Sequence, residues 1–68
     1  MDFMEIIRAI HAGKILEISS QRRYKTGPKA FLDSQPVNLS HAQRAIRNPS
    51  VKVTATGREW TAYGAAQQ

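Results

Sequence analysis

Near the start of the chain, apolar residues recur with the spacing of one face of a helix. The positions i, i+3, i+4 and i+7 are held by Phe3, Ile6, Ile7 and Ile10. Asp2 can cap the first turn, with Glu5 three residues later as in a capping box. Because Gly13 is a typical C-terminal stop, the pattern predicts a helix within residues 2–13.

The pattern then changes to that of a strand and a turn. Residues 14–19, KILEIS, are rich in isoleucine and bounded by a glycine and two serines, so we expect a strand there. The stretch 20–29 contains Thr26-Gly27-Pro28, which is turn chemistry, and we expect a loop or an arm. Ala30–Leu32 is a short apolar patch that fits either a strand or a helical turn.

A second helix is predicted over residues 38–48, NLSHAQRAIRN, and Pro49 ends it. Ser40 and Gln43 have the spacing of a capping box, whereas Asn38 is a rival cap. The side that we expect to be buried carries Leu39, Ala42, Ala45 and Ile46.

Residues 51–63 alternate as a β-hairpin does. A turn at Gly57-Arg58, with glycine first as type II′ turns prefer, pairs Val53 with Ala62 and Lys52 with Tyr63. In this register one face is apolar and collects Val51, Val53, Ala55, Trp60 and Ala62. We therefore expect Trp60 in the core, and Tyr63 exposed beside Lys52 in a cation–π contact.

Together these elements predict an α+β fold, with two helices packed on a small antiparallel sheet that contains the C-terminal hairpin. We expect one domain over residues 1–64 and a flexible tail over residues 65–68. A chain of 68 residues buries a small core, and without cysteine it has no disulfide. Self-association often compensates in such domains, which leaves a homodimer open.

The lengths of the apolar runs and the distribution of charge indicate in which compartment the protein works and what kind of partner it binds. Apolar runs reach two or three residues, far below the roughly 18 needed to cross a bilayer, and the start does not resemble a signal peptide. We expect a cytoplasmic protein. The net charge is +5, and residues 22–58 alone carry +7 while the segments before and after them each carry −1. This central excess of cations favours an acidic partner such as nucleic acid.

The sequence offers little for catalysis. Ser40 and His41 are adjacent at a helix start, where their side chains diverge, so they do not make a nucleophile and its base. The five acidic residues are scattered, and two histidines without cysteine are a poor metal set. KTGPK lacks the spacing of a phosphate-binding loop. We expect a non-enzymatic protein that needs no cofactor and no metal.

Cations and aromatic residues remain as the candidate binding site. Phosphate binding needs cations that reach one surface, with rings or amides to stack or donate. Three segments could supply them: the arm, the second helix and the hairpin. The candidate residues are Arg22, Arg23, Tyr24, Lys25, Lys29, His41, Arg44, Arg47, Lys52, Arg58 and Tyr63.

Two resemblances bear on function. A helix followed by a hairpin with an arginine at its tip resembles the end of a winged helix-turn-helix domain, which needs another helix where this chain has GPKAFLDSQPV. Residues 39–63, with LSHAQRAI, VKVTAT and GREWTAY, resemble small phage anti-CRISPR proteins of type I-F. That resemblance implies binding to a CRISPR surveillance complex and obstruction of its nucleic-acid path. Arg44 would correspond to the family's helix arginine, while its other helix cation falls on Gln43.

The leading hypothesis is a small basic protein of phage or mobile-element type that binds the phosphate backbone of DNA or RNA and has a regulatory role. The alternative is a phage-encoded inhibitor that docks on a host protein complex, as an anti-CRISPR protein does. Binding to nucleic acid should weaken steeply with salt, whereas a docked inhibitor should depend on one protein partner.

Overall fold

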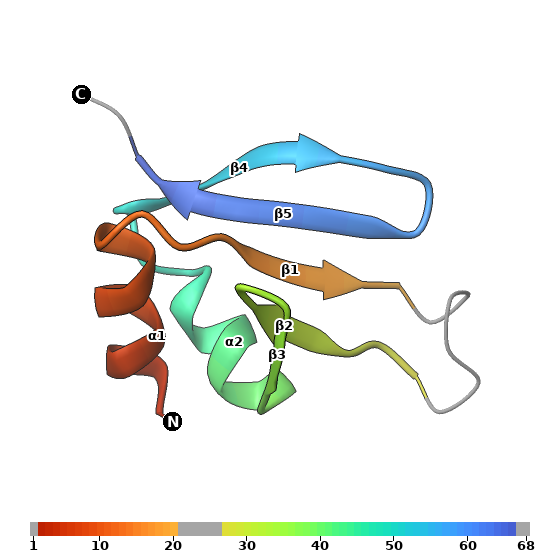
Figure 1. Cartoon of the computed structure of the whole chain (residues 1–68), viewed down its shortest axis with the longest axis horizontal. Helices are drawn as coiled ribbons and strands as arrows, with labels where there is room; N and C mark the ends of the chain where they lie inside the picture. The colour runs from red at the N-terminus through yellow and green to blue at the C-terminus, as the bar shows by residue number, and fades with distance from the viewer. Residues whose placement is uncertain (1, 21–26, 67–68) are drawn as a thin grey trace.

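The computed structural model describes residues 2–20 and 27–66. Within these ranges the chain forms two helices and five strands in the order α1–β1–β2–β3–α2–β4–β5 (Figure 1). Their bounds are α1 Phe3–His11, β1 Leu16–Ser19, β2 Ala30–Leu32, β3 Gln35–Val37, α2 Leu39–Ala45, β4 Val51–Thr56 and β5 Trp60–Ala65. The predicted α+β fold is confirmed.

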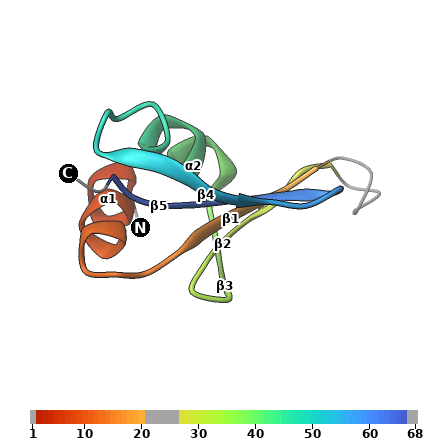
Figure 2. The same ribbon diagram turned by 90° about the horizontal axis from the view of Figure 1, so that it is seen from above.

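The five strands form one antiparallel sheet with the order β3-β2-β1-β5-β4. Both helices gather at one end of this sheet, and the turn between β4 and β5 extends past them at the other (Figures 1 and 2). The uncovered end is called the open end of the sheet below. It comprises Ser19, Ser20, Lys29 and residues 57–61, which stand where β1 finishes, β2 begins and β4 turns into β5.

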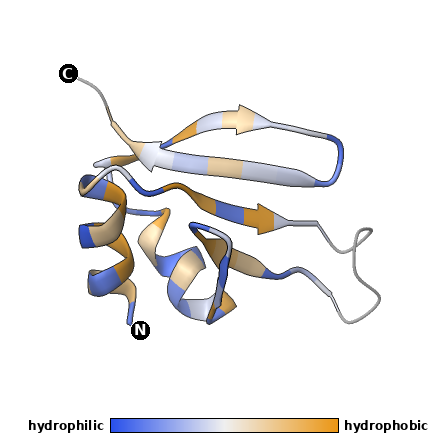
Figure 3. Ribbon diagram, in the orientation of Figure 1, coloured by the Kyte–Doolittle hydropathy of each residue, from blue (hydrophilic) through white to orange (hydrophobic). Residues whose placement is uncertain are grey.

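The core lies between the helices and one face of the sheet. Helix α1 contributes the buried residues Ile6, Ile7 and Ile10, and α2 contributes Ala42 and Ala45, whose small side chains allow close approach. The sheet supplies Leu16, Ala30, Leu32 and Val51. In Figure 3 the hydrophobic side of α1 faces α2 and the sheet, and its hydrophilic side faces outward. The predicted apolar stripe of the first helix is therefore the main wall of the core.

Helix α1 begins and ends as its sequence predicts. The Asp2 carboxylate accepts a hydrogen bond from the backbone N–H of Glu5 at 3.0 Å, so Asp2 is the N-cap. The helix ends before Gly13, which has a φ of +102°. Because residues with a Cβ rarely adopt this conformation, glycine suits the turn that leads into β1.

The cap of α2 is Asn38 and not Ser40. The Asn38 side-chain oxygen accepts hydrogen bonds from the backbone N–H groups of Ser40 and His41, at 2.9 and 3.3 Å. Ser40 already lies inside the first turn. Of the two caps that the sequence left open, the structure selects the earlier one.

Removing the Asn38 side chain should therefore destabilise the protein more than removing that of Ser40. We expect Asn38→Ala to lower the free energy of unfolding by about 1 kcal/mol, the usual value for an N-cap. The matched variant Ser40→Ala removes an exposed hydroxyl and should change it by less than about 0.5 kcal/mol. Urea unfolding followed by circular dichroism measures both values, and a larger loss for Ser40→Ala would contradict this cap.

The segment between residues 27 and 38, which the sequence left undecided, is a hairpin of β2 and β3. Its turn residues Asp33 and Ser34 both have positive φ, 51° and 69°, as a type I′ turn requires. Pro36 lies on β3, the edge strand of the sheet, where its missing N–H costs no ladder bond. In the described residues no helix precedes α2 in this stretch, so the arrangement differs from a winged helix-turn-helix domain.

The C-terminal hairpin is confirmed, but its predicted register is wrong. Thr56 pairs with Thr61, and the N–H of Gly57 donates to the carbonyl oxygen of Trp60, so the turn is centred on Arg58 and Glu59. The register then shifts at a bulge between Val53 and Ala55. A bulge inserts one extra residue into a strand, which strict alternation of apolar and polar residues cannot reveal.

This shift changes which side chains face the core. Val53 pairs with Tyr63, and Tyr63 pairs with the buried Leu16, so these residues share the face that the helices cover in part. Trp60 and Ala62 alternate with them and lie on the opposite face. The expected position of Trp60 in the helix-covered core is therefore corrected, as is the pairing of Lys52 with Tyr63, since Lys52 pairs with Gly64.

The C-terminal strand is longer than expected. Strand β5 continues to Ala65, and the N–H of Ala66 donates to the carbonyl oxygen of Ser50 at 2.7 Å. Residues 65 and 66 are thus held by β4 and its preceding turn. The sequence pattern does not reveal this extension, because backbone pairing needs no apolar side chain. Among the described residues, neither helix is long and apolar enough to cross a membrane.

Candidate nucleic-acid interface

Three segments are tied together by backbone hydrogen bonds at the open end of the sheet. The Ser19 N–H donates to the carbonyl oxygen of Lys29 at 2.8 Å, and the Ser19 hydroxyl bonds both backbone groups of Lys29. The Ser20 N–H donates to the carbonyl oxygen of Glu59 at 2.7 Å. The end of β1 therefore holds the beginning of β2 on one side and the β4–β5 turn on the other.

These bonds bring two of the predicted cations to one end of the molecule. Lys29 precedes β2 and Arg58 stands in the β4–β5 turn, and both are exposed. Two strand spacings, roughly 10 Å, separate the backbones of β2 and β5. This separation lets both side chains face one flexible polyanion, although Glu59 adds a carboxylate to the same turn.

Close packing shapes the turn that carries Arg58. A Cβ built on Gly57 would overlap the indole ring of Trp60, so only glycine leaves room for this ring. The Trp60 side chain thus folds against the turn and is partly buried there. Ring and glycine together hold the backbone from which Arg58 projects.

A shallow pocket of about 210 Å³ opens beside this turn. It combines one cation with hydroxyls and rings, and its lining is Ile18, Ser19, Ser20, Gly57, Arg58, Trp60, Thr61 and Tyr63. The Ser20 hydroxyl oxygen is buried and has no hydrogen-bond partner in the part of the chain that the structure describes. Such an unmet hydroxyl typically costs about 1–3 kcal/mol.

Tyr63 reaches this pocket from the helix-covered face. The residue is partly buried and packs against the core cluster, with Val53 opposite it on β4. Val53 keeps 53% of its surface exposed on β4, the edge strand of the sheet, whereas Leu16 on the other side of Tyr63 is completely buried. Tyr63 therefore combines a fixed position with a partly accessible ring.

The other predicted cations in the described residues lie toward the helix end. The Arg44 guanidinium stacks over the Phe3 ring, 4.0 Å from its centroid, and so covers the contact between the two helices. Arg47 and Lys52 flank the start of β4, which the hydrogen bond between His11 Nε2 and Ser50 Oγ at 2.7 Å holds beside the end of α1. About 17 Å of strand separates that start from the turn with Arg58.

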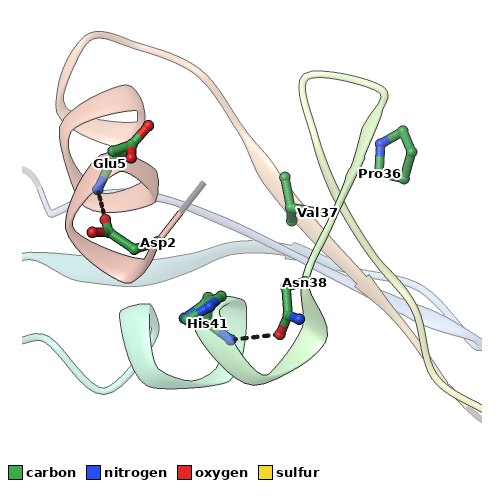
Figure 4. A pocket seen from close by; sticks show the side chains of 6 residues that line it. All are labelled: Asp2, Glu5, Pro36, Val37, Asn38 and His41. Carbon is green, nitrogen blue, oxygen red and sulfur yellow. Dashed lines mark hydrogen bonds between the residues drawn. The ribbon is translucent and has the colours of Figure 1, made fainter.

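His41 faces a second pocket, of about 620 Å³, between the start of α1, β3 and the start of α2 (Figure 4). The lining is Asp2, Glu5, Pro36, Val37, Asn38 and His41. Two carboxylates stand in this pocket, and Asp2 and Asn38 are engaged as helix caps. Because carboxylates repel phosphate, this larger pocket is a poor phosphate site, and the structure separates His41 from the cations of the open end.

Four of the exposed cations in the described ranges are not neutralised by an ion pair there. Within residues 2–20 and 27–66, none of Arg44, Arg47, Lys52 and Arg58 pairs with a carboxylate. Their charges therefore face solvent and add to the potential that an anionic partner meets. Arg22, Arg23, Tyr24 and Lys25 lie outside the described residues, and Ser20, which precedes them by two positions or more, stands at the open end.

One histidine and one serine in the described ranges lie at hydrogen-bond distance from each other. The pair His11 and Ser50 has the distance of a nucleophile and its base, yet the Ser50 hydroxyl donates its proton to Asn48 Oδ1 at 2.7 Å. His11 Nε2 must then donate to Ser50, so it cannot act as the base for this hydroxyl. No group of three His, Cys, Asp or Glu side chains in this part of the chain is placed to hold a metal.

Sequence reasoning missed Ser20, Thr61 and Trp60 as neighbours of Arg58. A serine and a threonine carry no distinctive signal, and only the correct hairpin register reveals that they line one pocket with Tyr63. Gly57 at the end of the strand pattern was the available clue, because a glycine in or beside a strand often marks a place where another group approaches the backbone closely.

Comparisons of the chain with known protein families, with characterised proteins and with solved structures returned no match. The function is therefore argued from the geometry and charge of the site.

Proposed function

We propose that this protein is a small, non-enzymatic nucleic-acid-binding protein that contacts the phosphate backbone at the open end of the sheet. One observation carries the proposal: backbone hydrogen bonds of Ser19 and Ser20 set Lys29 and the turn with Arg58 at the end of β1, directly before the basic segment 21–26. Cations that are distant in the sequence thereby belong to one end of a molecule 35 Å long.

The physical role of these cations is phosphate neutralisation. Each phosphate paired with Lys or Arg releases counterions, and this release supplies most of the affinity of sequence-independent binding. The open end also lacks the apolar cover that the helices give the rest of the sheet, so a strand of nucleic acid meets no obstruction from α1 or α2 there (Figure 2).

Salt dependence tests this proposal directly. We propose up to five phosphate contacts, by the candidate cations Arg22, Arg23, Lys25, Lys29 and Arg58. Contact of all five with phosphates of a single strand predicts that log K falls with log salt with a slope of about −3.5. Fluorescence anisotropy with a labelled oligonucleotide of mixed sequence, from 50 to about 300 mM NaCl, measures the slope, and absence of binding at the lowest salt would contradict the proposal.

A second candidate function is docking on a host protein complex, in the manner that the anti-CRISPR resemblance implies. The exposed Val53 beside Tyr63 favours it, since exposed apolar and aromatic side chains are typical of protein contacts. A pull-down from host lysate distinguishes the two functions. One protein partner that survives nuclease treatment, with an affinity that varies little with salt, would support docking and oppose nucleic-acid binding.

A further inference from the structure

The pocket beside the β4–β5 turn has the composition of a site for a single nucleotide. Arg58 supplies a cation at its rim, Thr61 supplies a hydroxyl, and Ile18 and Tyr63 supply apolar surface. Its volume of about 210 Å³ is below the range of roughly 300–1,000 Å³ typical of drug-sized ligands. A planar base with one phosphate matches this combination of charge, hydroxyl and ring.

We infer that the open end binds single-stranded nucleic acid, with one unpaired base entering this pocket against Tyr63 and its phosphate held by Arg58. This inference rests on the proposed function and narrows it to single strands. Bases in a duplex are stacked and paired, so a pocket of this kind receives a base only from a single strand or after flipping.

Helix α2 is poorly placed to read a duplex, which favours the same conclusion. It has seven residues, with Ala42 and Ala45 buried against the core. Its arginine, Arg44, stacks over Phe3 of α1. A recognition helix inserts exposed side chains into the major groove, whereas α2 is short and its arginine is engaged with α1.

The ring that meets the base is fixed before binding. Tyr63 pairs with Leu16 on one side and Val53 on the other, and it packs against the core cluster. A ring held in this way loses little side-chain freedom when a base stacks on it. Stacking on aromatic rings tolerates any base, so little sequence preference is expected.

The test compares three labelled probes by fluorescence anisotropy at one salt concentration: a 12-nucleotide DNA strand, the same sequence as RNA, and the 12-base-pair DNA duplex. We expect at least one single strand to bind about tenfold more tightly than the duplex, because stacking adds to phosphate contact. Equal affinity for strand and duplex would overturn the inference and leave the proposed function standing. Absence of binding to all three would overturn both.

Substitutions of Tyr63 distinguish a loss of base stacking from a loss of folded structure. Tyr63→Leu should weaken single-strand binding about tenfold and leave duplex binding unchanged, while Tyr63→Phe should retain the wild-type affinity. Circular dichroism confirms that each variant is folded. If Tyr63→Leu does not fold, the wild-type protein decides: the emission of Trp60, which lines the same pocket, should change when the DNA strand binds and stay constant with the duplex. Constant emission with the bound strand would overturn the inference.

Discussion

Replacing Ile10 by alanine should destabilise the protein by about 2–5 kcal/mol. Ile10 is completely buried, and it belongs to the α1 stripe that meets α2 and the sheet. A 68-residue domain has a total stability of roughly 3–10 kcal/mol, so this single change should remove a large part of it. The loss combines the transfer of the removed side-chain carbons with the cavity that they leave.

The control for this prediction is another isoleucine in the same part of the chain. Ile15 precedes β1 and keeps 44% of its surface exposed. Ile15→Ala makes the same chemical change and should cost less than about 1 kcal/mol. Urea unfolding of both variants, followed by circular dichroism at 222 nm, gives the two free energies. Similar losses for the two would mean that α1 does not form the main wall of the core.

The helices were predictable because each is specified by local signals. The α1 stripe, its Asp2 cap and its Gly13 stop act within a few residues of one another, and the structure confirms all three. The cap of α2 was ambiguous because Asn38 and Ser40 both have suitable side chains. Hydrogen-bond geometry, which the sequence does not contain, decides between them.

The β2–β3 hairpin and the register of β4–β5 were not predictable for a different reason. Asp33-Ser34 is not the Asn-Gly or Asp-Gly pair that usually marks a type I′ turn, so sheet pairing on both sides must hold it. The alternation of residues 51–63 suits several registers until the bulge after Val53 is known. Both features depend on strand partners that are far away in the sequence.

The same dependence on distant partners governs the candidate site. The sequence indicated candidate cations for binding but not how those of the described residues divide between the ends of the fold. Pairing of β1 with both β2 and β5 places Lys29 near Arg58 and leaves Arg44 and Arg47 toward the helix end. Charge composition alone treats all of these residues as equivalent.

A pair of charge reversals should separate the two ends of the molecule by their binding. Arg58→Glu and Arg47→Glu each replace one positive charge by one negative charge, so each lowers the net charge from +5 to +3. Both side chains are exposed in connections between secondary-structure elements, and neither pairs with a carboxylate among the described residues. The two variants therefore have the same amino-acid composition and the same net charge. They differ only in the position of the reversed charge, at the open end or at the helix end.

Phosphate contact at the open end predicts unequal effects. Arg58→Glu removes a charge-assisted hydrogen bond, which contributes about 1.5–3 kcal/mol, and adds repulsion, so affinity should fall about tenfold or more. The slope of log K against log salt should become shallower by about one unit. Arg47→Glu should cause only the weak, uniform loss that follows from lower net charge, within about threefold at 150 mM salt, where charges more than about 8 Å away are largely screened.

The ratio of the dissociation constants of these two variants for one labelled single strand, measured by fluorescence anisotropy at 150 mM NaCl, is the most direct test of the open end as the binding site. With both proteins folded, we predict that Arg58→Glu binds several-fold to tenfold more weakly than Arg47→Glu. Equal affinities, or a greater loss for Arg47→Glu, would contradict the assignment of nucleic-acid binding to the open end of the sheet.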